Sequence, residues 1–363
     1  MLSKIKPKKG SKKLINAWAF YDWANSVYSL VITTAIFPLY YAALFAENNI
    51  IFFMGYQIKN TAMISFLTAF AFVIISFISP ILAGIADFLG NKKRFMQFFV
   101  YLGSFSCIGL FWFNLENIYT GLFLYFLALI GFWASLIFYN SYLPDVAYPE
   151  QQDKASARGY SLGYIGSVIL LLFNLSLIMQ PDFYGISGTP QEARFYAMKI
   201  SFVCVGLWWL IFSVYSFSKM NIVETKSGKV SIANAYSRNF TTLKKIRKFP
   251  FLLYFLISYI FFWDGLQTLI NMSAAFFTEV LLLDQTQVLI VFLVVQFVAY
   301  FGAKLAGNLA TKIGQKNVLY YTMFLLFLVG NAAYFVPEKQ LGPVIVMGIV
   351  TACLLYTSDA ADE

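Results

Sequence analysis

The sequence predicts an all-α integral membrane protein, and three observations lead to this class. Of the 363 residues, 60% are hydrophobic and only 12% are charged, which is about half the charged share of a typical soluble domain. Apolar runs of about 20 residues, long enough to cross a bilayer as a helix, recur along the chain. The charged residues gather between these runs, so the net charge of +9 belongs to the loops.

Nine of the apolar runs are long enough for complete spans, and a tenth begins near residue 342. The first and the seventh are longer than a bilayer needs, which predicts tilted or kinked helices. Pro38 and Pro80 are the expected kink sites, because proline removes a helical hydrogen bond. The predicted spans cover residues 15–45, 61–86, 95–113, 120–143, 159–180, 196–217, 251–280, 286–310 and 318–336.

Lysine and arginine fall almost entirely on one side of these spans. If the N-terminus is cytoplasmic, 22 of the 26 basic residues lie on the cytoplasmic side, and only Lys59, Arg194, Lys199 and Lys339 lie outside. This asymmetry follows the positive-inside rule. We therefore expect a cytoplasmic N-terminus, and the basic surplus is explained without a nucleic-acid partner.

The first span carries a carboxylate, Asp22, inside an otherwise apolar run. Asp22, Asn25, Ser26 and Ser29 stand at i, i+3, i+4 and i+7, so they share one face of a helix. An acidic side chain in a membrane normally faces a bundle interior or a water-filled cavity, and marks a substrate or ion pathway. The alternative is a structural acid that pairs with a basic loop residue.

A polar segment, residues 218–250, follows six predicted spans and is expected to be a cytoplasmic linker. It separates an N-terminal six-helix half, residues 1–217, from a C-terminal half, residues 251–352, which holds helices 7 to part of 10. An internal repeat supports this division, because segments 83–92 and 307–316 align without gaps and each ends the second helix of its half. The identical pairs are Ala86 and Ala310, Gly90 and Gly314, and Lys92 and Lys316.

The seventh span repeats the polar spacing of the first. Asp264, Gln267, Thr268 and Asn271 again stand at i, i+3, i+4 and i+7. The first helix of each half therefore has a polar face that begins with an aspartate. This pattern predicts two halves around a shared cavity, as in transporters built from repeats. The candidate substrate or proton residues are Asp22, Asn25, Ser26, Asp264, Gln267 and Asn271.

Carboxylates, hydroxyls and amides are the chemistry that this composition offers. The chain has no histidine, so we expect no metal site and no cofactor. An unpaired carboxylate in a low-dielectric environment favours its neutral form, and either acid is a candidate proton carrier. Each could instead pair with an amine on a substrate.

The predicted function is therefore secondary transport. An enzyme is less favoured, because no metalloprotease or serine-hydrolase motif is present. A sensor or scaffold would need a larger polar domain than the linker offers.

The loop after the second span resembles the inter-helix signature of the major facilitator superfamily. It reads Gly84-Ile-Ala-Asp87-Phe-Leu-Gly90-Asn-Lys-Lys-Arg94, with Phe88 where that signature usually has an arginine. Such a loop acts as a gate, in which charged groups form a network in one state and release it in another. The candidate gating residues are Asp87, Gly90, Lys92, Arg94 and Arg158.

Longer stretches resemble one family within that superfamily, the vacuole effluxers. They are residues 18–28, 262–270, 139–145 and 156–166, within a likeness that runs from about residue 16 to residue 352. The resemblance implies a twelve-helix fold of two pseudo-repeated six-helix halves, of which this chain stops in helix 10. It also implies export of amino acids or similar small metabolites. The composition, rich in Lys, Asn, Ile and Phe, suggests an AT-rich bacterial genome, and no organelle-targeting presequence is evident. We therefore expect a monomer in the bacterial inner membrane, with the bilayer and the substrate as its partners.

Residues 353–363 are set apart from the fold. The stretch Cys353-Leu-Leu-Tyr-Thr-Ser-Asp-Ala-Ala-Asp-Glu363 matches the translation of a transposase adapter used in sequencing libraries. We therefore expect an artefact there, and a natural chain that continues past Ala352.

Overall fold

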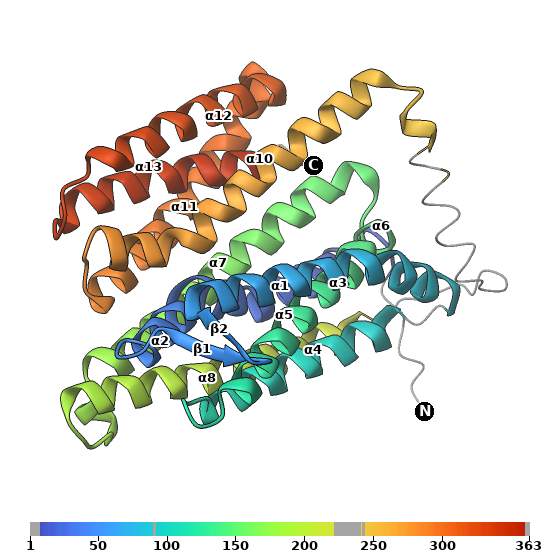
Figure 1. Ribbon diagram of the computed structural model, residues 1–363. Coiled ribbons are helices and arrows are strands. Elements are labelled where there is room, and N and C mark those ends of the chain that lie inside the picture. The colour runs from blue at the N-terminus through green and yellow to red at the C-terminus, as the bar shows by residue number, and fades with distance from the viewer. Residues whose placement is uncertain (1–7, 90–91, 221–240, 242–243, 360–363) are drawn as a thin grey trace. The chain divides into compact units, whose positions relative to one another are not determined.

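The computed structural model describes the backbone of residues 8–89, 92–220, 241 and 244–359. The side chains of 83–89, 153, 271, 300, 303–312, 315 and 353–359 lie outside the described set. Figure 1 shows that the chain is almost entirely helical, as predicted. Within the described residues, eight helices are long and apolar enough to cross a membrane, and two shorter apolar helices cover Gln285–Ala299 and Leu341–Ala352.

The first span is one helical run, Lys12–Leu44, in three parts. It consists of α1 (Lys12–Val27), a π-helical segment (Tyr28–Ala35) and α2 (Ile36–Leu44). The π segment ends three residues before Pro38, the expected kink site. A proline cannot donate to the carbonyl four residues before it, and a π-helical stretch is one way to accommodate that loss.

The other elements follow the predicted order, with two differences. A short hairpin that the apolar pattern did not predict precedes α3. It consists of β1 (Ile50–Phe53) and β2 (Tyr56–Lys59). The fifth span, α7, begins ten residues earlier than expected, because its polar first turns continue the helix. The helices are α3 (Asn60–Leu89), α4 (Lys92–Gly109), α5 (Ile118–Ser141), α6 (Leu143–Val146), α7 (Pro149–Met179), α8 (Pro190–Lys219), α10 (Pro250–Ala275), α11 (Gln285–Ile313), α12 (Gln315–Ala332) and α13 (Leu341–Asp359).

Short helical turns end or join several of these helices. They are Leu110–Trp112 after α4, Pro181–Tyr184 before α8, Ala333–Phe335 after α12, and a second π-helical segment, Phe276–Val280, after α10.

The chain divides into two compact units, each made of several segments of the sequence. The first unit comprises residues 1–28, 41–163 and 199–257. Its core is aromatic, with Tyr21, Tyr142, Phe138 and Trp209 fully buried. Tyrosine and tryptophan combine large apolar area with a polar group that needs a partner, so this core contains hydrogen-bonding groups as well as apolar rings.

Two glycines let α4 and α5 approach closely in the first unit. A methyl group at Gly131 of α5 would lie 2.6 Å from the Cα of Gly103 of α4, and one at Gly103 would lie 2.3 Å from the Trp209 ring. Membrane helices pack through small residues of this kind, because van der Waals contact replaces the hydrophobic driving force. The α4 and α5 helices therefore pack closely, and α5 supplies Tyr139 and Ser135 to the site on α1.

The second unit comprises residues 29–40, 164–198 and 258–363. In it α11, α12 and α13 lie side by side (Figure 1). Leu266 of α10 packs with Leu326 of α12, and Phe262, Trp263, Ile270 and Val329 surround this pair.

Candidate functional site

The polar face predicted on the first span is present on α1. Asp22 is 7% exposed and Asn25 is 1% exposed, whereas Ser26 is half-buried. Ser29 is exposed and lies in the π-helical segment, where the helical repeat changes. The first three residues therefore form the buried part of the face.

Tyr139 of α5 holds the Asp22 carboxylate. Its hydroxyl donates to Asp22 Oδ2 at 2.7 Å, a charge-assisted hydrogen bond when the acid is ionised. The Tyr139 ring stacks on Trp18 with centroids 4.3 Å apart, and its backbone carbonyl accepts from Trp18 Nε1 at 3.0 Å. Within the described residues no lysine or arginine forms an ion pair with Asp22. The alternative of a structural acid paired with a basic loop residue thus finds no support in this part of the chain.

Two glycines of α7 cover the same face. A methyl group at Gly159 would lie 2.3 Å from Asp22 Oδ2 and 3.0 Å from the Tyr139 hydroxyl. A methyl group at Gly163 would lie 2.4 Å from Ser26 Oγ. Glycine is needed wherever a backbone approaches this closely, so α7 seals the acid and the serine.

A second hydrogen-bonded layer lies beside the acid and joins three helices. The Tyr21 hydroxyl of α1 donates to Ser135 Oγ of α5 at 2.8 Å, and Ser135 Oγ donates to the Phe132 carbonyl at 2.7 Å. Trp209 Nε1 of α8 donates to the Tyr21 hydroxyl at 3.4 Å. This layer fixes the α1 backbone next to Asp22, which holds the carboxylate in place.

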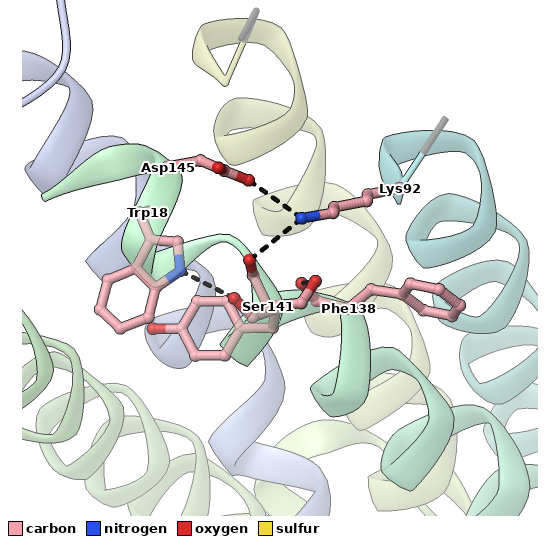
Figure 2. A network of polar contacts seen from close by, with 6 residues as sticks. Trp18, Lys92, Phe138, Ser141 and Asp145 are labelled. Atoms are coloured by element: carbon pink, nitrogen blue, oxygen red, sulfur yellow. Dashed lines mark hydrogen bonds and ion pairs between the residues drawn. The ribbon is translucent and has the colours of Figure 1, made fainter. Parts of the chain in front are cut away.

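An ion pair joins the start of α4 to α6, as Figure 2 shows. Lys92 Nζ lies 3.1 Å from Asp145 Oδ2, and it also donates to the Ser141 carbonyl at 3.3 Å. The Ser141 hydroxyl donates in turn to the Phe138 carbonyl at 2.8 Å. Ser141 lies two residues after Tyr139, so the last turn of α5 contacts both Lys92 and the buried acid.

Asp145, Ser141 and Tyr139 were not among the predicted site residues. A signal for them was present, because the segment 139–145 covers the end of the fourth span and contains an acid and several polar groups. Helical spacing could not place that acid against Lys92, which lies 53 residues earlier in the chain.

The other predicted gating residues are less informative. Arg94 and Arg158 are exposed, and no ion pair in the described part of the chain includes either. Gly90 and the side chain of Asp87 lie outside the described residues. Lys92 is thus the one candidate gating residue for which the described part of the structure shows an ion pair.

The acid-led face of α10 has different surroundings. Asp264 is exposed and Gln267 is half-buried, while the side chain of Asn271 lies outside the described residues. A methyl group at Gly265, next to Asp264, would meet nothing within 4 Å. The matched spacing of the two acids therefore does not extend to matched surroundings.

A metal centre is not evident in the described residues. No group of three or more Cys, Asp or Glu side chains there could hold a metal ion. The chemistry of the site rests on a carboxylate, phenols, hydroxyls and one ion pair.

Comparison with known proteins identifies relatives over most of the chain. The family model described as "Vacuole effluxer Atg22 like" matches residues 10–336. An uncharacterised MFS-type transporter of Bacillus subtilis, YxiO, is 33% identical over 321 residues, which are 88% of this chain and 73% of the relative. Autophagy-related protein 22 of Candida albicans is 24% identical over 237 residues, 62% of this chain and 46% of that protein. This chain thus spans about three quarters of the first relative and under half of the second.

Solved structures of major facilitator transporters share the fold. A bacterial homologue of the human lysosomal transporter Spinster aligns with a TM-score of 0.61 and 16% identity, over 97% of this chain and 75% of that one. The Escherichia coli xylose transporter XylE aligns with a TM-score of 0.58 and 13% identity, over 96% and 85%. The predicted fold class is confirmed.

Proposed function

The chain belongs to the vacuole effluxer Atg22-like family of MFS-type membrane transporters, and we propose that it exports amino acids or similar small metabolites by proton-coupled alternating access. That the protein is a transporter and not an enzyme follows from the family. The substrate, the coupling ion and the direction of transport are the proposed part.

Asp22 carries the proposal of proton coupling. It is buried on a membrane helix, its described contacts include a neutral phenol, and no basic side chain in the described part pairs with it. An acid in such a place in a membrane protein marks an ion or substrate pathway. When Asp22 is ionised it accepts the Tyr139 hydroxyl, and when it is protonated it can itself donate.

Tyr139 offers a route from this proton to a gate. A changed hydrogen bond at its hydroxyl acts on the last turn of α5, and the Ser141 carbonyl in that turn accepts from Lys92. The Lys92–Asp145 pair is an interaction that a transporter can make in one state and break in the other. We infer that binding of a proton at Asp22 alters the stability of this pair.

The family relation supports the substrate class. Autophagy-related protein 22 gives the family its name, and the resemblance implies export of amino acids. An ammonium group on an amino acid is a natural partner for a carboxylate such as Asp22 or Asp264. We propose a monomer in a bacterial plasma membrane with a cytoplasmic N-terminus, since a Bacillus protein is among its relatives and the basic loops lie on one side.

Flux in liposomes tests the proposal. Purified protein in vesicles with an imposed pH gradient should move one or more radiolabelled amino acids, and it should acidify or alkalinise the lumen in step. Asp22→Asn should remove the proton flux, while Asp182→Asn, the same change at an exposed acid in the turn before α8, should leave it intact. Amino-acid flux without proton movement would refute coupling, and absence of any flux would favour a sensor or scaffold.

A further inference from the structure

The hairpin after the first span consists mostly of apolar residues, and few of their side chains are buried. Its strands pair antiparallel, with Phe53 opposite Tyr56, and Met54 and Gly55 form the turn at φ values of 50° and 87°. Of the four β1 residues only Ile51 is buried. The segment 50–59 carries a single charge, Lys59, at its base.

The base of the hairpin is fixed to the membrane helices of the first unit. The Tyr41 hydroxyl of α2 donates to the Asn60 carbonyl at 3.0 Å, and the Asn60 backbone N–H donates to the Asn49 carbonyl at 2.8 Å. The Tyr119 hydroxyl, at the start of α5, donates to the Phe52 carbonyl. These contacts hold the backbone of the hairpin in one position, and the side chains at its tip stay exposed.

The tip exposes large apolar side chains. Met54 is 83% exposed, Tyr56 is 75% exposed and Phe52 is 59% exposed. Met54 also adopts a positive φ, which is uncommon for a residue other than glycine. A turn that faced water would be expected to contain Asn, Asp or Gly at that position.

Exposed aromatic and apolar side chains also occur at Tyr119 and in the loop between α4 and α5. Tyr119, which contacts the hairpin, is exposed on α5, and Trp112 and Leu115 are exposed where α4 leads into α5. The Asn117 side chain donates to the Trp112 carbonyl at 2.7 Å, which ties that loop together. Tryptophan and tyrosine are enriched where membrane proteins meet the lipid headgroups.

We propose that the hairpin tip, formed by Phe52, Met54 and Tyr56, inserts into the interfacial layer of the leaflet at which the first span ends. The short distance along the chain between the hairpin and the flanking membrane helices supports lipid as the partner of the tip. The hairpin starts six residues after the end of α2 and leads directly into α3, and a four-residue strand reaches only about 13 Å. Its tip therefore stays near the headgroups, where amphipathic aromatic side chains bind.

A site-specific probe in nanodiscs tests this proposal. Met54→Cys would be labelled with an environment-sensitive fluorophore, after Cys107, Cys204 and Cys353 are replaced by serine. The matched control is Ser187→Cys, an exposed polar position in the loop after the fifth span, which lies on the same side because both loops follow odd-numbered spans. Gel filtration confirms that both labelled proteins remain folded and monodisperse.

The expected result is a blue-shifted emission at position 54 that is quenched by lipids with a nitroxide near the headgroup. The label at position 187 should keep a water-like emission and resist that quenching. Water-like emission at position 54 in nanodiscs would overturn the proposal. So would a blue shift that appears only after a soluble protein is added, because the occupant would then be a protein partner.

Discussion

The first helices of the two halves carry the same polar spacing and meet different surroundings. In the most apolar part of the first span 67% of the residues are buried, against 6% in the seventh. Asp22 is covered by the α7 backbone at Gly159 and accepts a hydrogen bond from the Tyr139 hydroxyl, whereas Asp264 is exposed. Spacing decides which residues share a face, but the small residues of the neighbouring helix decide whether that face is sealed.

Neutralising each acid gives the largest expected difference. Asp22→Asn keeps the shape and removes the titratable charge, so we expect the pH dependence of transport to be lost. Asp264→Asn should reduce transport less, because the Asp264 side chain is exposed and that of Asp22 is buried. Initial rates of substrate flux in liposomes across a series of pH values measure both. Equal losses in the two variants would mean that the acids act as one site.

The glycines beside the two acids provide a matched pair. Gly159→Ala places a methyl group 2.3 Å from Asp22 Oδ2, and overpacking of this kind costs about 1–3 kcal/mol. Gly265→Ala meets nothing within 4 Å and should stabilise its helix by up to about 1 kcal/mol. Thermal unfolding in detergent should show a lower Tm for the first and an equal or higher Tm for the second. A neutral Gly159→Ala would mean that α7 does not seal Asp22.

Lys92, which pairs with Asp145, can be compared with Lys316, the equivalent residue in the repeat. We expect a double-mutant cycle of Lys92→Ala and Asp145→Ala to give a coupling of about 0.2–1 kcal/mol, since Asp145 is partly exposed. Lys316, the equivalent of Lys92, lies 5.8 Å from the centre of the Tyr320 ring, and Lys316→Ala should change unfolding little. Unfolding midpoints of the four cycle proteins measure the coupling, and a value of zero would remove the pair from the gate.

The smallest expected effect comes from one hydroxyl. Tyr139→Phe removes the donor to Asp22 and keeps the ring stacked on Trp18, which should lower stability by about 1 kcal/mol and shift the pH profile of transport. Tyr254→Phe, at an exposed position on α10, is the control and should change neither. An unshifted pH profile in Tyr139→Phe would show that the hydroxyl does not act on the acid.

Helical periodicity predicted most of this architecture, because each span is a long apolar run with its own repeat. It placed Asp22, Asn25 and Ser26 on one face, as found. It missed the hairpin, since Ile50 to Phe53 forms an apolar run too short to separate strand from helix. It also missed Tyr139 and Asp145, because their partners come from helices far apart in sequence, and such pairings depend on packing geometry.

The first turn of α4 is basic, and the acid that pairs with it lies much later in the chain. Lys92, Lys93 and Arg94 occupy the first turn without an acidic residue, although the helix dipole disfavours cations at that end. Asp145, which pairs with Lys92, is synthesised 53 residues later. The first turn of α4 therefore has three cations and lacks this counter-charge until α5 and α6 have been made, and the ion pair with Asp145 can form only then.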